Sequence, residues 1–136
     1  MAAQTILIAE DDPDIRDGVR ILLAGEGYHI LEAENGTRAL EIFNPEVDLV
    51  ILDIMMPGMD GFAVLKAMEN RNMLEETPVI MISGESANDT IRHAYEMGVS
   101  DYVTRPFDER IVRRRVNNTI TFFSVIPPPM LMDTRR

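Results

Sequence analysis

The sequence predicts an α/β fold in which helices cover both faces of a five-stranded parallel sheet. Three observations support this prediction. Short apolar runs alternate along the chain with longer segments of helical period, and the connections between them are short. The run at residues 47–53 is almost continuously apolar, which is typical of a strand buried on both faces of a sheet. The length of 136 residues suits one domain.

The first strand and helix illustrate the repeating unit. Residues 5–9 (TILIA) are too few and too β-branched for a buried helix, so they predict a strand. Pro13 suits the first turn of a helix, and Gly25 and Gly27 end the helical segment. Between these signals, apolar residues recur on one helical face at Ile15, Val19, Leu22 and Leu23.

The same alternation continues to residue 123. A short helix over about residues 37–44 is expected to stop at Pro45, because the residue before a proline disfavours helical backbone. Gly98 closes the fourth helix, and the fifth begins near Phe107. The other strands are expected at residues 28–32, 47–53, 78–83 and 101–104, and the third and fourth helices at about 61–71 and 86–97. Right-handed crossovers then give a doubly wound sheet, for which we expect the flavodoxin-like strand order 2-1-3-4-5.

The composition excludes several classes of function. The chain has no cysteine, which rules out disulfides, zinc thiolate sites and thiol catalysis. Its first residues lack the features of a signal peptide, and charges interrupt every apolar run before it reaches membrane-spanning length. We therefore expect a cytoplasmic protein without membrane contact. The formal net charge of −10 argues against direct nucleic-acid binding, and the arginines at 113–115 are expected to form a solvated helix face.

The candidate site follows from the topology, because ligands of such sheets bind at the carboxyl ends of the strands. The residues expected there are Asp11, Asp12, Asp53, Ser83 and Arg105. Converging carboxylates repel one another unless a cation holds them, and a carboxylate-rich oxygen set suits Mg²⁺. Ser83 can hydrogen-bond a phosphoryl oxygen, and Arg105 supplies a fixed positive charge. This set indicates phosphoryl transfer onto a carboxylate, with Asp53 as the nucleophile.

Four stretches of the sequence resemble response-regulator receiver domains. They are residues 11–13, 53–61, 79–84 and 98–107, in this order and at receiver-like spacing. The resemblance covers about residues 4–123, nearly the whole chain. It predicts a receiver domain at residues 1–124, followed at residues 125–136 by a Pro-rich tail or linker, because the prolines at 127–129 cannot continue a helix.

The resemblance implies roles for individual residues. Asp53 would accept the phosphoryl group, and Asp11 and Asp12 would bind Mg²⁺ directly or through water. The backbone carbonyl of Met55 would be a further ligand. The donor would be a phosphohistidine on a histidine kinase or phosphotransfer protein. The domain would be a two-component signalling module that assists its own phosphorylation and dephosphorylation, and not an enzyme.

The resemblance also implies a switch. Ser83 would hold the phosphoryl group and move inward, and Tyr102 would move from an exposed to a buried position as it does so. The face made by the fourth helix, the fifth strand and the fifth helix would change with it. In one large branch of the family this face forms a homodimer through charged pairs, and Asp101 and Arg115 fall at similar positions.

Arg105 departs from the family pattern, which has lysine at this position. The resemblance still implies a cis peptide bond between Arg105 and Pro106. Arginine is longer, planar and always charged, so it can neutralise a phosphoryl oxygen but fits a crowded pocket differently. The alternative is a pseudo-receiver that is not phosphorylated and acts as a constitutive docking or dimerisation module. A second alternative concerns Asp11 and Asp12, which could simply cap the helix that starts at Pro13.

Two other classes of protein are disfavoured by single positions. A haloacid-dehalogenase-type phosphatase needs a second acid two residues after its nucleophile, where this chain has Met55. An FMN-binding flavodoxin-like protein needs a phosphate loop rich in glycine and hydroxyl groups after the first strand. This chain has Glu10, Asp11 and Asp12 there, which would repel phosphate.

Overall fold

Strands and helices alternate strictly through residues 3–125, the part of the chain that the computed structural model describes. The elements are β1 (Thr5–Ala9), α1 (Pro13–Ala24), β2 (His29–Ala33), α2 (Gly36–Ile42), β3 (Val47–Leu52), α3 (Gly61–Asn70), β4 (Val79–Ser83), α4 (Asn88–Glu96), β5 (Asp101–Thr104) and α5 (Glu109–Val125). The strands pair in parallel in the order β2-β1-β3-β4-β5. The predicted fold class and strand order are confirmed. The predicted tail lies outside the described residues, except for Val125 at the end of α5.

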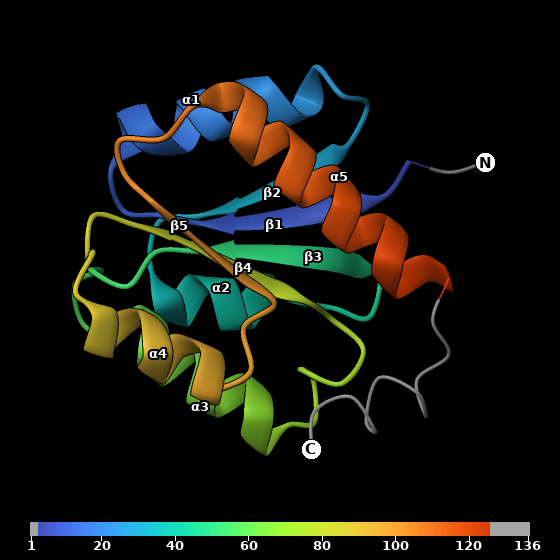
Figure 1. Cartoon of the computed structure of the whole chain (residues 1–136). Coiled ribbons are helices and arrows are strands. Elements are labelled where there is room, and N and C mark those ends of the chain that lie inside the picture. Colours follow the sequence, from blue (N-terminus) through green and yellow to red (C-terminus); the bar gives the residue numbers. More distant parts are fainter. Residues whose placement is uncertain (1–2, 126–136) are drawn as a thin grey trace.

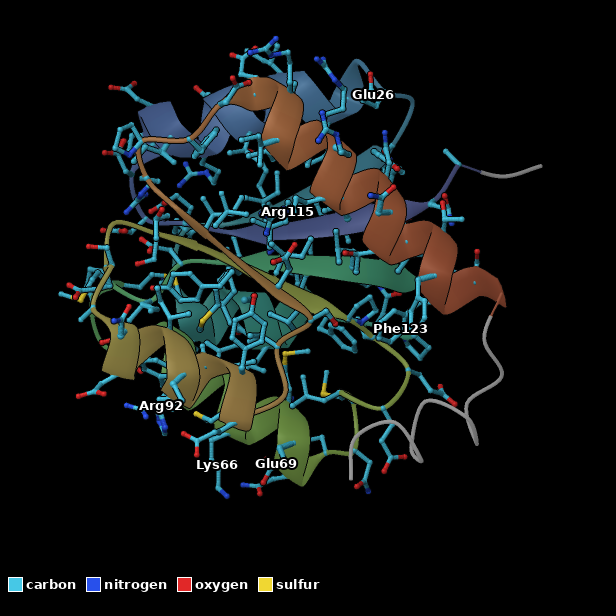
Figure 2. All side chains as sticks on the ribbon, in the orientation of Figure 1. Glu26, Lys66, Glu69, Arg92, Arg115 and Phe123 are labelled. Atoms are coloured by element: carbon cyan, nitrogen blue, oxygen red, sulfur yellow. The ribbon has the colours of Figure 1, made fainter. Side chains whose placement is uncertain are left out.

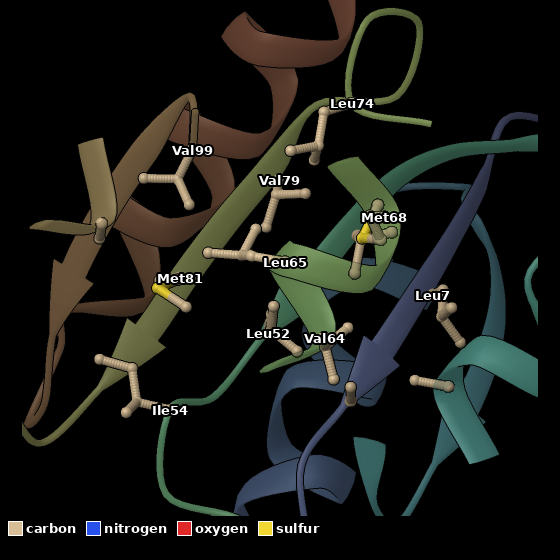
Figure 3. Close-up of a cluster of buried hydrophobic side chains, with 14 of the residues drawn as sticks. Leu7, Leu52, Ile54, Val64, Leu65, Met68, Leu74, Val79, Met81 and Val99 are labelled. Atoms are coloured by element: carbon tan, nitrogen blue, oxygen red, sulfur yellow. The ribbon is translucent and has the colours of Figure 1, made fainter. Parts of the chain in front are cut away.

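Helices cover the sheet in two layers (Figure 1). Helices α1 and α5 lie on one face, and α2, α3 and α4 lie on the other. Each layer encloses its own apolar cluster against the sheet. Successive residues of a strand point to opposite faces, so a central strand contributes to both clusters. In β1, Leu7 joins the cluster beneath α2–α4 (Figure 3), whereas Ile6 and Ile8 join the cluster beneath α1 and α5.

Helix boundaries differ from the prediction by one to a few residues, for local reasons. Helix α5 starts at Glu109 and not near Phe107, because Asp108 acts as its cap: its side chain accepts a hydrogen bond from Arg110 N (2.8 Å), and its carbonyl accepts from Ile111 N (3.0 Å). Helix α2 ends at Ile42, because Phe43 already has extended backbone.

The parallel pairing places the carboxyl ends of β1, β3, β4 and β5 at one edge of the sheet. The loops that leave this edge carry the residues considered below. Within the described residues, no helix is long and apolar enough to cross a bilayer.

Candidate functional site

Asp53 stands directly after β3, at the centre of this edge. Its backbone N–H donates to Ala9 O (3.1 Å), which fixes it beside the end of β1. The residue is 3% exposed, and its Oδ1 atom is buried without a hydrogen-bond partner among the described residues. A buried carboxylate oxygen without a partner is costly, because it has lost its water and gained nothing in exchange. The atom therefore has free capacity to bind a cation or to attack an electrophile.

Three carboxylates gather at this point. Glu10, Asp11 and Asp53 each offer an oxygen, and these oxygens lie within 4.8 Å of one another. Asp11 is exposed, whereas Glu10 and Asp53 are buried. Such a set of converging oxygens suits a hard divalent cation such as Mg²⁺. Sequence reasoning placed Asp11 and Asp53 here but overlooked Glu10, although Glu10 follows β1 directly.

Asp12 has a different place. Its Oδ1 atom accepts hydrogen bonds from Asp14 N (2.9 Å) and Ile15 N (3.3 Å), so Asp12 is the N-cap of α1. It is exposed and does not belong to the group of three carboxylates. The structure therefore does not support Asp12 as a ligand, because its side chain already serves the helix. The capping alternative describes this residue.

Arg105 supplies positive charge to the carboxylates. Its Nη1 donates to Glu10 Oε1 (2.7 Å), and its Nη2 lies 3.6 Å from Asp53 Oδ2. The Arg105–Pro106 peptide bond is cis. The pKa of Glu10 is raised to about 8, chiefly by burial and then by the charge of Asp53, while the hydrogen bond from Asp12 N–H and the charge of Arg105 act in the opposite direction. The guanidinium thus only partly offsets the crowding of the carboxylates.

Ser83 and Tyr102 hold the loop that follows β4. Ser83 is fully buried, and its Oγ accepts a hydrogen bond from Glu85 N (3.3 Å). The Tyr102 hydroxyl donates to Glu85 O (2.7 Å), and the residue is buried in the structure. Burial raises the pKa of Tyr102 above its ordinary value of 10.0. The backbone of Arg105 donates to Ser83 O (2.9 Å), so the ends of β4 and β5 are tied together.

The loop between Asp53 and α3 depends on a glycine. A Cβ atom on Gly61 would lie 2.4 Å from Asp53 O, closer than any real contact. Gly61 N also donates to Ile54 O (2.8 Å), which closes the loop onto its own start. Asp60 then caps α3 by accepting from Ala63 N (2.9 Å). Met55, whose carbonyl the resemblance implicates in metal binding, lies on this loop with an exposed side chain.

The family model for the response regulator receiver domain matches residues 6–117, most of the chain. The chain belongs to this family. Curated relatives of this receiver domain include response regulator RR06 of Streptococcus pneumoniae, 35% identical over 122 residues, which cover 89% of this chain and 55% of that protein. The phosphate regulon transcriptional regulatory protein PhoB of Pseudomonas aeruginosa is 34% identical over 111 residues, which cover 81% of this chain and 48% of that protein. The chain thus spans about half the length of these relatives.

Solved structures resemble the receiver domain over its whole fold. Chemotaxis protein CheY4 of Vibrio cholerae superposes with a TM-score of 0.80 at 25% identity, covering 87% of this chain and 99% of that one. Response regulator TrrA of Thermotoga maritima, solved in complex with Mg²⁺ and BeF, gives a TM-score of 0.74 at 30% identity and covers 85% and 98%. The five-stranded order of the sheet and the placement of its helices therefore follow an established architecture.

The Asp101 and Arg115 side chains, which sequence reasoning placed on a dimer face, pair within one chain. Arg115 Nη1 donates to Asp101 Oδ1 (2.6 Å), and the Tyr95 hydroxyl donates to the same oxygen (3.2 Å). Asp101 begins β5, and Arg115, which is labelled in Figure 2, lies on α5, so the pair links two elements of the same face.

Proposed function

We propose that this receiver domain takes a phosphoryl group onto Asp53 from a phosphohistidine of a histidine kinase or phosphotransfer protein. A carboxylate oxygen of Asp53 attacks phosphorus, a P–O bond forms, the P–N bond to the donor imidazole breaks, and the imidazole leaves with the electron pair. The observation that carries the proposal is the buried Oδ1 atom of Asp53, which has no hydrogen-bond partner within residues 3–125 and lies among acidic and basic groups.

Glu10, Asp11 and Asp53 fit a Mg²⁺ ion, because their oxygens converge and one of those residues carries the unpartnered oxygen. The Met55 carbonyl, on the loop after Asp53, is a further proposed ligand. When bound, the ion neutralises charge on the carboxylates and on the incoming phosphoryl oxygens. Glu10 takes in this proposal the place that the sequence alone gave to Asp12.

The remaining residues of the site hold the transferred group and transmit its presence. Arg105 donates to a phosphoryl oxygen once one of its nitrogens leaves its carboxylate partner. Ser83 can donate its hydroxyl proton to a phosphoryl oxygen, since the hydrogen bond from Glu85 N uses its Oγ as an acceptor. Any inward movement of Ser83 disturbs the Glu85 loop, to which Tyr102 is also bonded. We propose that this loop couples Asp53 to the face made by α4, β5 and α5.

The test is incubation with acetyl phosphate, or with beryllofluoride, in the presence of Mg²⁺, read by intact mass and by amide NMR. We expect wild type to gain one phosphoryl mass and Asp53→Asn to gain none. Asp11→Asn should lose the Mg²⁺ dependence, whereas Asp12→Asn is the matched control and should behave as wild type, because asparagine still caps a helix. Absence of the added mass in wild type at every Mg²⁺ concentration would refute the proposal.

A pseudo-receiver is the second candidate, and the observation in its favour is the ion pair of Arg105 with Glu10 (2.7 Å). A guanidinium held by that carboxylate offsets part of the negative charge of the site without a metal or a phosphoryl group. In that case neither acetyl phosphate nor beryllofluoride changes the spectrum, and the domain acts through a constitutive partner.

Homodimerisation through α4, β5 and α5 is a separate proposal about partners. Because Asp101 and Arg115 are bonded to each other within one chain, a dimer that uses them must exchange this pair between copies. Light scattering before and after beryllofluoride addition tests it, and an unchanged mass counts against it.

A further inference from the structure

The domain has a hollow in its surface at the end of the sheet opposite Asp53. It is a groove of about 780 Å³ between the end of α3, the end of α4 with the turn into β5, and the second half of α5. Figure 2 labels Glu69 on α3 and Phe123 on α5 at this end of the molecule. None of the carboxylates at the Asp53 site lines this groove.

The groove combines exposed aromatic rings with acidic groups. Tyr95 and Phe122 line it and are each 46% exposed, and Phe122 packs edge-to-face on Phe123 with ring centroids 5.7 Å apart. Exposed aromatic surface of this kind is typical of a binding site. The groove is also lined by three glutamates and by no basic side chain of the described residues; they are Glu69, Glu75 and Glu96.

Two of these glutamates have no ion-pair partner among residues 3–125. Glu69 pairs with Lys66 (3.2 Å), whereas no ion pair within that range includes Glu75 or Glu96. Their charges therefore add to the aromatic surface a preference for a positively charged occupant.

We propose that residues 126–136 of this chain bind in the groove. The segment reads IPPPMLMDTRR and begins immediately after α5, whose last turns carry Phe122 and Phe123. Consecutive prolines favour the extended polyproline conformation, which binds aromatic-lined grooves at low entropic cost. The following Met-Leu-Met triplet is apolar and adaptable. Arg135 and Arg136 supply positive charge that complements the carboxylates of Glu75 and Glu96.

Reach and tethering both favour an intramolecular contact. Eleven residues in polyproline conformation extend about 34 Å, whereas a domain of this size has a radius of gyration of about 14 Å. The segment can therefore cross the groove from the end of α5 to α3. Tethering gives it an effective concentration in the millimolar range, so even weak side-chain contacts lead to substantial occupancy. This proposal does not depend on phosphorylation of Asp53.

Paramagnetic relaxation in the full chain tests the proposal. The chain has no cysteine, so Thr134→Cys provides a single site for a spin label. We expect amide signals of Glu96, Ser100 and Asn118 to broaden relative to a diamagnetic label, and those near Asp53 to stay sharp. A label that broadens no groove amide overturns the proposal. So does broadening found only when labelled unenriched chains are mixed with unlabelled enriched ones, since the occupant is then a second copy.

Charge variants give the second measurement. Reversing both glutamates (Glu75→Lys with Glu96→Lys) should reduce the broadening at Ser100 severalfold, and adding Arg135→Glu with Arg136→Glu should restore it. Asp17→Lys, on α1 and away from the groove, is the matched control. Equal broadening in wild type and in the reversed variant would show that the charges do not direct the segment, which also overturns the proposal.

Discussion

Replacement of Arg105 by methionine isolates the role of the guanidinium in the acidic site. Arg105 contacts two carboxylates from different strand ends, at 2.7 Å from Glu10 and 3.6 Å from Asp53. Methionine keeps an unbranched, mostly apolar chain but removes the charge. The variant therefore leaves two buried carboxylates close together with no cation between them.

The expected cost follows from the burial of the partners. Removing one member of a buried ion pair typically costs about 3–5 kcal/mol. Here the Arg105 side chain is 21% exposed, so water screens part of its charge. Glu10 has a pKa of about 8 even beside Arg105, so it is already largely protonated at neutral pH, which reduces the cost further. We therefore expect Arg105→Met to lower the free energy of unfolding by about 2 kcal/mol at neutral pH.

Urea unfolding followed by circular dichroism measures this loss. With a slope of about 2 kcal/mol per molar urea, the midpoint in EDTA should fall by about 1 M. Mg²⁺ should stabilise the variant more than wild type, because a bound ion replaces the missing charge. Arg92→Met is the matched control, since Arg92 pairs with Asp89 on the surface and its loss should cost at most about 1 kcal/mol without any Mg²⁺ dependence. The reasoning is wrong if Arg105→Met is as stable as wild type in EDTA, or if Mg²⁺ stabilises both equally.

The other predictions concern single residues around Asp53. The pKa of Glu10 is higher in the folded protein than the ordinary 4.5, so the folded state holds its proton to higher pH. Wild type should therefore lose stability relative to Glu10→Gln as pH rises from about 4.5 to 8, by at most about 1.4 kcal/mol per pH unit. An unfolding free energy from urea that changes with pH equally in both proteins would contradict this. Gly61→Ala should lower the free energy of unfolding by more than about 2 kcal/mol in thermal unfolding, because the added Cβ would meet Asp53 O. Its control is Gly18→Ala, in open space on α1, which should raise the free energy of unfolding by up to about 1 kcal/mol. Asp12→Ala should lower the free energy of unfolding by about 1 kcal/mol, because α1 loses its N-cap. Its Mg²⁺ affinity, measured by titration calorimetry, should stay unchanged, and a large loss of affinity would restore Asp12 as a ligand.

The architecture could be predicted because the sequence repeats one pattern with few exceptions. Short, nearly continuous apolar runs identify the strands and period-3.6 apolar patterns identify the helices, and short connections between parallel strands restrict the order of the sheet. Helix ends were less certain, since they depend on which side chain captures a free backbone amide. Asp108 delays the start of α5 in this way, and sequence pattern gives no measure of that competition.

The site was predictable where position on a strand decides the outcome. Asp53 and Arg105 directly follow strands and Ser83 is the last residue of β4, so parallel pairing brings them together. The run of acids at residues 10–12 was harder, because it spans the junction between β1 and α1. Successive residues there point in different directions, and only two positions along the chain separate a buried ligand candidate, Glu10, from an exposed helix cap, Asp12.

The fork of the guanidinium explains how arginine fits a position where the family has lysine. Two nitrogens of one planar group engage two carboxylates that come from the ends of β1 and β3. An ammonium is a compact point charge without this planar fork. Arg105 is bonded to Glu10, and under the proposed function this bond must open before Arg105 can turn fully to a phosphoryl group on Asp53. Because Glu10 also belongs to the carboxylate group that fits Mg²⁺, the proposed ion and Arg105 would compete for the same carboxylate, and binding of the ion would favour release of Arg105. Under the proposed function, charge neutralisation would thus be divided between an internal cation and an external one.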